Sequence, residues 1–143
     1  MPSLATTDDE ITQCYTVMQE LRPHLVRCDF LATVRLMQQD GYQLGYIKNE
    51  SDVVAVAGFR IATNLFMGKH LYVDDLVTAE QQRSKGYGEQ LIHWLRDLAK
   101  AEGCAYLHLD SGTHRGRAHK FYFAQGFSIA SYHFSEKLRA TDL

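Results

Sequence analysis

Proline is nearly absent from this sequence of 143 residues, with two, and glycine is modest, with ten. This scarcity excludes collagen-like and low-complexity chains. No apolar run approaches the roughly 18 residues of a membrane-spanning helix, and the first residues lack the basic and apolar regions of a secretory signal. An excess of one charge is also missing: 15 basic and 17 acidic residues give a net charge of −2, which disfavours a nucleic-acid surface. We therefore expect a cytoplasmic protein with a small or roughly neutral partner, neither nucleic acid nor membrane.

Cysteine is scarce as well. The three cysteines are Cys14, Cys28 and Cys104. They are odd in number and widely spaced, so we expect reduced thiols that act as small core residues, not a disulfide framework or a zinc site. Seven histidines also lack the spacing of metal ligands, and no metal is predicted. Among them, His108, His114 and His119 surround a segment discussed below, where either a proton-handling role or a plain surface position stays open.

What is present suits one globular domain over residues 1–143, since 45% of the residues are hydrophobic and 22% are charged. Apolar periodicity predicts its elements. These are helices over 8–21 and 30–39, strands over 42–48, 52–66 and 70–78, an amphipathic helix around 89–100, a strand over 105–109, a helix over 117–125 and a strand over 127–134. Residues 1–7 and 139–143 are expected to fray.

A polar loop with two glycines, QQRSKGYG at 81–88, separates the third strand from the amphipathic helix. Glycines where a strand leads into a helix let backbone N–H groups converge on an anion at the positive helix N-terminus. Two common phosphate motifs are not matched: G-x-x-x-x-G-K-[ST] is absent, and the third glycine of the dinucleotide fingerprint is replaced by Leu91. The loop alone leaves two alternatives open, a phosphate site and a tight turn.

Two motifs resolve this ambiguity by resemblance. Arg83-x-x-Gly86-x-Gly88 resembles the [Q/R]-x-x-G-x-[G/A] signature of the GNAT superfamily of acyl-CoA-dependent N-acetyltransferases, and residues 118–127 resemble its second motif, A-x-x-F-Y-x-x-x-G-F. The resemblance covers the chain from Tyr42 onwards. It implies an α/β fold: a three-layer α/β/α domain whose mixed, mostly antiparallel sheet is splayed between two parallel central strands, 70–78 and 105–109.

Within that family, residues 118–138 resemble aminoalkylphosphonate N-acetyltransferases, and residues 71–76 resemble the strand with an acidic pair in spermidine/spermine N-acetyltransferases. The implied activity is acetyl transfer to a primary amine of a small molecule. A non-catalytic CoA-binding module and a protein N-acetyltransferase are alternatives. An acidic pair favours a cationic acceptor, whereas Arg115, Arg117 and Lys120 favour an anionic one or the CoA phosphates, so the acceptor stays open. Homodimerisation, common in the family, also stays open.

The resemblance implies a site for acetyl-CoA. Backbone amides of the loop would hold the pyrophosphate, with added charge from two basic side chains, and the end of the third strand would hydrogen-bond the pantetheine arm. The implied residues are Leu76, Val77, Thr78, Arg83, Ser84, Lys85, Gly86, Tyr87 and Gly88. Arg115 stands where many members have an asparagine that contacts the cofactor, and it is included among the candidate cofactor-binding residues.

The resemblance also implies direct transfer, without a covalent enzyme intermediate. Tyr122 lies where the second motif places the group that protonates the CoA sulfur, and a tyrosine with a pKa near 10 stays protonated at neutral pH. Asp74 and Asp75 are the candidates for the base or for binding the amine. Because adjacent strand residues point to opposite faces, only one of them is expected to face the substrate in a regular strand, and a bulge could change which one it is. Cys104 is not expected to act as a nucleophile.

Overall fold

The computed structural model describes all residues, 1–143, and divides into two units, Met1–Leu109 and Asp110–Leu143, which are described separately. The first unit contains β1 (Ser3–Leu4), α1 (Asp8–Gln13), α2 (Tyr15–Leu21), α3 (Arg27–Gln38), β2 (Tyr42–Asn49), β3 (Asp52–Asn64), β4 (Gly68–Thr78), the 3-10 turn η1 (Glu80–Gln82), α4 (Tyr87–Ala101) and β5 (Tyr106–Leu109). The second contains α5 (Gly116–Ala124). That the whole chain forms one domain stays a prediction.

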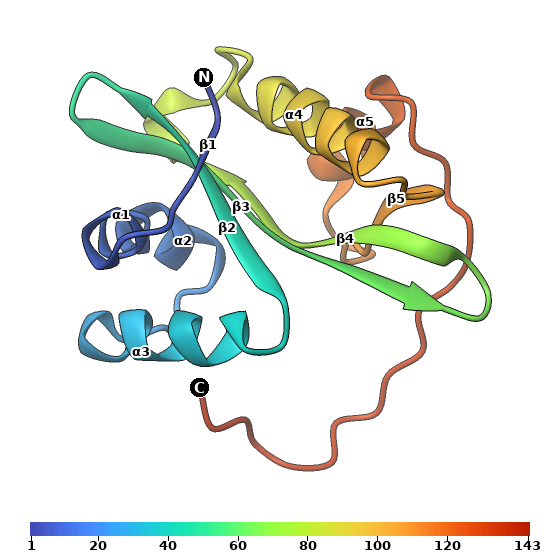
Figure 1. Ribbon diagram of the computed structural model, residues 1–143, viewed down its shortest axis with the longest axis horizontal. Coiled ribbons are helices and arrows are strands. Elements are labelled where there is room, and N and C mark those ends of the chain that lie inside the picture. Colours follow the sequence, from blue (N-terminus) through green and yellow to red (C-terminus); the bar gives the residue numbers. More distant parts are fainter. The chain divides into compact units, whose positions relative to one another are not determined.

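A single sheet with the strand order β1-β2-β3-β4-β5 forms the centre of the first unit (Figure 1). The first three pairings are antiparallel, and β4 pairs with β5 in parallel. A parallel pair needs a crossover, and α4 supplies it. The prediction of a mixed, mostly antiparallel sheet with two parallel strands is confirmed.

Two hydrophobic cores lie on opposite faces of this sheet. Helices α1, α2 and α3 cover one face with a core that includes Ile11, Leu44 and Val56. Helix α4 covers the other face with Leu91 and Leu95, which pack on residues such as Ala57. Val56 and Ala57 are adjacent in β3 yet belong to different cores, as the alternation of strand side chains requires. This arrangement confirms the three-layer prediction (Figure 1).

The N-terminal segment is held in place by hydrogen bonds from Ser3 onwards, which differs from the expectation that residues 1–7 fray. Ser3 and Leu4 pair with β2, and the Ala5 N–H donates to Leu44 O at 2.8 Å. Thr7 then caps α1 in a capping box: its side chain accepts from the Glu10 N–H, and the Glu10 carboxylate accepts from the Thr7 N–H at 2.9 Å. The N-terminal segment is therefore hydrogen-bonded to β2 and to the first turn of α1.

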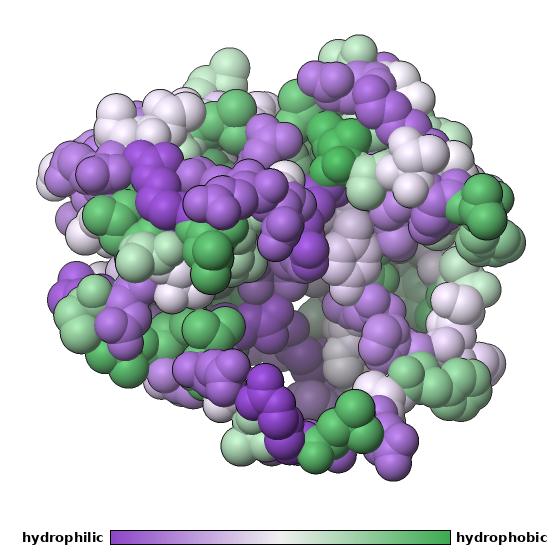
Figure 2. Space-filling model, turned by 60° about the horizontal axis from the view of Figure 1, so that its bottom comes forward, coloured by the Kyte–Doolittle hydropathy of each residue, from purple (hydrophilic) through white to green (hydrophobic).

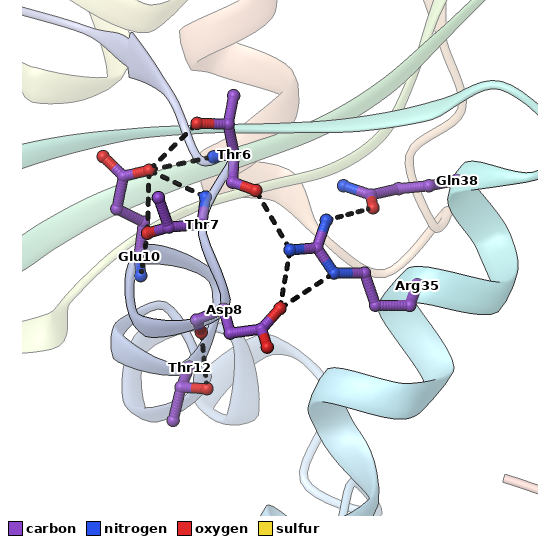
Figure 3. A network of polar contacts seen from close by, with 7 residues as sticks. All are labelled: Thr6, Thr7, Asp8, Glu10, Thr12, Arg35 and Gln38. Atoms are coloured by element: carbon purple, nitrogen blue, oxygen red, sulfur yellow. Dashed lines mark hydrogen bonds and ion pairs between the residues drawn. The ribbon is translucent and has the colours of Figure 1, made fainter.

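An arginine of α3 reinforces this end of the chain. The Arg35 guanidinium donates to the Asp8 carboxylate at 2.7 Å and to Thr6 O at 3.0 Å (Figure 3). The single helix predicted over 8–21 is interrupted at Cys14. Its N–H donates to Ile11 O, an i→i−3 bond that closes α1 before α2 begins.

The strand predicted over 127–134 is also wrong, because no strand follows α5. The N–H groups of Gly126 and Phe127 instead close the C-terminus of α5 by donating to Phe123 O and Tyr122 O. Beyond them, Ile129 and Phe134 are exposed. An alternating apolar pattern becomes a strand only where a neighbouring strand satisfies its backbone, and none does so here.

The surface in Figure 2 is mostly hydrophilic, with hydrophobic residues in small separate groups. None of the helices combines the length and the apolar composition that crossing a membrane would require.

Candidate functional site

The sheet of the first unit opens where β5 ends. The last pair between β4 and β5 is Val73 with Leu109, whereas β4 continues to Thr78. Beyond Val73, β4 therefore has a strand neighbour only on the β3 side. This opening lies where the predicted residues Leu76, Val77 and Thr78 are found.

Only two of those three residues turn their backbone groups to the open edge. The Ala79 N–H donates to Val54 O of β3 at 2.8 Å. Because backbone groups alternate along a strand, Val77 also faces β3, while Leu76 and Thr78 face the opening. The Val77 side chain is buried in the core under α1, α2 and α3. The backbone groups of Leu76 and Thr78 thus face the opening, whereas those of Val77 face β3.

The glycine loop leads from this opening into α4. Ser84 and Gly86 have positive φ values of 66° and 86°, and Gly86 is the N-cap of α4 with no side-chain cap hydrogen bond. Left-handed residues are typical of loops whose successive N–H groups converge on an anion. The first N–H groups of a helix lack partners within it, and here no side chain replaces them. Lys85 is exposed and donates to Gln82 Oε1 at 2.9 Å. The residues present therefore fit a pyrophosphate.

A β-bulge lies at the other end of the opening. Gly58 of β3 pairs with Asp75 and Phe59 with Val73, so Asp74 is the extra residue. Both carboxylates consequently lie on the face of the sheet that α1, α2 and α3 cover. Asp75 accepts from the Tyr42 hydroxyl at 2.8 Å, and Asp74 accepts from Arg60. Adjacent side chains of a regular strand point to opposite faces, and here the bulge interrupts this alternation, so both carboxylates point to the same face.

Each carboxylate is paired with an arginine. Arg22, the C-cap of α2, contacts Asp75 Oδ1 through Nε at 3.0 Å and Nη2 at 2.9 Å, and Nη2 also donates to the Asp74 carbonyl at 2.9 Å. Arg60 contacts Asp74 Oδ1 through Nη2 at 2.7 Å and Oδ2 through Nε at 3.1 Å. We call these four side chains the arginine–aspartate cluster.

Electrostatics and packing hold this cluster in place. The hydrogen bond to Asp74 raises the pKa of Arg60. Burial, followed by the charge of Asp75, raises the pKa of Tyr42 well above its usual value, so its hydroxyl remains a donor. A Cβ atom at Gly58 would overlap the Tyr42 hydroxyl and lie 2.6 Å from Asp75 Oδ2. Glycine is therefore required at that position for steric reasons.

A histidine pair continues the same face along β4 and β5. His70 Nδ1 lies 2.8 Å from His108 Nε2, and His70 Nε2 lies 3.3 Å from Asn64 Nδ2. The Met67 N–H donates to Asn64 Oδ1, so the Asn64 amide turns its NH₂ group to His70. His70 therefore carries its proton on Nδ1 and donates it to His108. His108 is thus hydrogen-bonded inside the protein instead of being a plain surface residue.

The second unit carries Tyr122 on α5 and Arg115 as the N-cap of that helix. Burial raises the pKa of Tyr122 above 10, and the charge of Arg115 offsets part of this shift. The ring packs against Phe121 and Phe127 with centroids 5.5 and 5.9 Å away. The Tyr122 hydroxyl therefore stays protonated at neutral pH, as a proton donor must.

His119, on the same helix, contacts Gly112 O through Nε2 at 2.8 Å.

The cysteines differ from one another. Cys14 is buried, and burial, followed by the charge of Glu10, raises its pKa to about 12. Cys28 is exposed, so the expectation of a core position is wrong for this residue. Cys104 is half-buried. No three His, Cys, Asp or Glu side chains are grouped so that they could hold a metal ion.

Four residues of the site are missing from the sequence-based prediction: Arg22, Tyr42, Gly58 and Arg60. Arg22 lies 53 positions before Asp75, and no periodicity links the two. Gly58 lies within β3, where the neighbouring residues set the strand pattern and give no sign of a steric role for the glycine. The single available signal is the need of two adjacent carboxylates for cationic partners, and that need does not say which arginines supply them.

A parallel strand pair that opens beyond Val73, next to an uncapped helix N-terminus, defines an α/β domain suited to a long ligand with a phosphate group. The chain matches the Acetyltransferase (GNAT) family over residues 5–127, and it belongs to this family. It is 34% identical over 131 residues to the uncharacterized N-acetyltransferase YhdJ of Bacillus subtilis, which covers 90% of this chain and 92% of that protein.

Two further similarities are more distant. Over 66 residues the chain is 27% identical to the aminoalkylphosphonate N-acetyltransferase of Salmonella typhimurium, covering 46% of this chain and 43% of that one. The fold resembles the solved structure of AAC(6')-Iy in complex with a bisubstrate analog of CoA, with a TM-score of 0.84, 14% identity and 98% of each chain covered. The predictions of a GNAT fold, an acyltransferase and acetyl-CoA as co-substrate are confirmed.

Proposed function

We propose that this chain transfers an acetyl group from acetyl-CoA directly to a primary amine of a small molecule, in the cytoplasm. The observation that carries the proposal is the open edge of β4, which connects the uncapped N-terminus of α4 with the arginine–aspartate cluster. One end suits a phosphate group and the other end suits an amine. The two substrates would meet along the residues between them.

The co-substrate end uses mainly backbone groups. The amides from Arg83 to Gly88 would hold the pyrophosphate, and the side chains of Arg83 and Lys85 would add positive charge. The free backbone groups of Leu76 and Thr78 would bind the pantetheine arm as a neighbouring strand would. Val77 would contribute packing, since its backbone faces β3. Arg115, which precedes α5 as its N-cap, would add a cation for the CoA phosphates.

The reaction requires a free amine and a proton for the leaving thiolate. Acetyl-CoA supplies a thioester whose carbonyl carbon bonds to the amine nitrogen as the carbon–sulfur bond breaks. Asp74 and Asp75 would orient the amine and take up its proton, directly or through water. Tyr122 would protonate the sulfur, a role that its raised pKa supports. No covalent intermediate with the enzyme is required.

The test is release of the CoA thiol from acetyl-CoA with a panel of small primary amines. Reactions without amine, and without acetyl-CoA, control for hydrolysis and for the three protein thiols. Amine-dependent thiol release with a matching acetylated product supports the proposal. A higher melting temperature with acetyl-CoA but no turnover of any amine contradicts it, and turnover of peptide amines alone would then indicate a protein N-acetyltransferase.

A further inference from the structure

We infer that the acceptor amine carries its own acidic group, a carboxylate or a phosphonate, and that Arg22 and Arg60 bind this group. The inference rests on the proposed function, since it concerns the same site. It is drawn from the charges and the exposure of the arginine–aspartate cluster. It predicts a zwitterionic acceptor in preference to a diamine or polyamine.

The first argument is charge. Asp74 and Asp75 form an adjacent acidic pair, which by itself would attract a polycation. Each of them, however, already has an arginine within 2.9 Å, so the four side chains sum to zero charge. A second cationic group of an acceptor would have to compete with a charge-assisted, two-point contact. A wall of zero net charge has no net attraction for a dication, whereas its two guanidinium groups can pair with an acidic group of the acceptor.

The second argument is exposure. The side chains of Asp75 and Asp74 are only 12% and 17% exposed, whereas those of Arg22 and Arg60 are 42% and 45% exposed. An incoming molecule therefore meets the guanidinium groups before it meets the carboxylates. Arg22 and Arg60 contact their aspartates through Nε and Nη2, and the hydrogen bonds of both side chains run through these two atoms. The Nη1 amino group of each guanidinium can therefore donate to a carboxylate or a phosphonate.

The third argument concerns the amine end of the acceptor. A carboxylate offers about four acceptor positions. Asp74 uses one contact on each oxygen, and Asp75 Oδ2 accepts only from Tyr42. Lone pairs therefore remain for one ammonium group. The cluster can serve both ends of a small zwitterion, with the amine on the carboxylates and the acidic group on the arginines.

The fourth argument is that the cluster is assembled before any ligand binds. Arg22 also donates to the Asp74 carbonyl, Tyr42 holds Asp75, and Gly58 leaves room for both. A site fixed in this way loses little conformational freedom when it binds. Both arginines have to stay in place, because removing them would leave two carboxylates unpaired. The charges of the cluster are therefore fixed, and they select among acceptors by charge.

The experiment measures kcat/KM by thiol release for three acceptors of equal length: 2-aminoethylphosphonate, ethylenediamine and propylamine. We expect the wild-type chain to favour the phosphonate at least tenfold over both others. Arg22→Gln and Arg60→Gln should each reduce this preference at least tenfold, and should raise activity with ethylenediamine because a carboxylate is released. The KM for acetyl-CoA should not change.

Arg35→Gln is the matched control, since Arg35 is an exposed arginine in an ion pair with Asp8 outside the cluster. It should leave the preference unchanged. A wild-type chain that turns over propylamine or ethylenediamine as well as the phosphonate overturns the inference and leaves the proposed function intact. Absence of turnover with every amine overturns the proposed function itself. Should Arg22→Gln fail to fold, Arg22→Lys keeps the charge, loses the Nη1 donor of the guanidinium and should weaken the phosphonate preference in the same direction.

Discussion

Two parts of the first unit, the loop 83–88 and the bulge at Asp74 and Asp75, are held in place by different means. The loop keeps its shape through its own backbone, with left-handed Ser84 and Gly86 and no side-chain cap on α4. The bulge is held by side chains from three other elements, α2, β2 and β3. A change in the loop therefore acts through one residue, whereas a change at the bulge acts through several partners.

This difference matches what each part would bind. Acetyl-CoA is the co-substrate, and we propose that backbone groups, which any sequence provides, are sufficient to hold it. Acceptors differ between members of a family, so side chains must distinguish them. We therefore expect loop variants to change the KM for acetyl-CoA and bulge variants to change the choice of acceptor.

The largest effect is expected from Tyr122, which belongs to neither part. Tyr122→Phe removes a proton donor and leaves the ring packing of the second unit in place. Loss of such a group lowers kcat by about 100-fold. The melting-temperature shift with acetyl-CoA should be retained, which distinguishes a chemical role from a binding role. An unchanged kcat would assign the proton transfer to water or to another residue.

Gly58→Ala should break the bulge without touching the loop. The added Cβ meets the Tyr42 hydroxyl and Asp75, and overpacking of this kind lowers the free energy of unfolding by about 1–3 kcal/mol. The measurement is urea unfolding, together with kcat/KM for the preferred acceptor, which should fall while the KM for acetyl-CoA stays the same. Gly116→Ala is the control, because a Cβ there meets nothing within 4 Å. Equal stability of the two variants would show that Tyr42 and Asp75 move aside easily.

The same contrast decides how far the sequence predicts the structure. The amphipathic pattern of α4 and the glycines of the loop are local signals, and the structure has the predicted helix and a loop before it with a positive φ at Gly86. The arginine–aspartate cluster depends on contacts over 14 and 53 positions, which no local pattern encodes. The strand predicted after Gly126 is wrong for a related reason: alternation describes a strand's faces but not the partner that its backbone needs.

A smaller effect is expected from Gly86→Ala, which probes the loop. No atom lies within 4 Å of a Cβ at Gly86, so its requirement for glycine is conformational, at φ 86°. An alanine in this region costs about 1–2 kcal/mol, so we expect the KM for acetyl-CoA to rise about tenfold. Gly86→Asn should restore part of the loss, since asparagine tolerates this conformation better. A change in acceptor preference in either variant would contradict the separation of loop and bulge.

The smallest effect concerns stability alone. It is expected at the capping box of α1, which lies outside both the loop 83–88 and the bulge. Glu10 has its pKa lowered from 4.5 to about 2, chiefly by the N–H groups of Thr7 and Thr6 and then by the Tyr46 hydroxyl. A carboxylate with a depressed folded-state pKa stabilises the fold above its unfolded pKa and loses this contribution as the pH falls through the folded value. In Glu10→Gln, the free energy of unfolding should be lower at pH 6 and converge with wild type between pH 4.5 and 2. Parallel curves over that range, measured by urea unfolding, would show that the Glu10 charge contributes nothing, and kcat at pH 7 should be equal in both proteins.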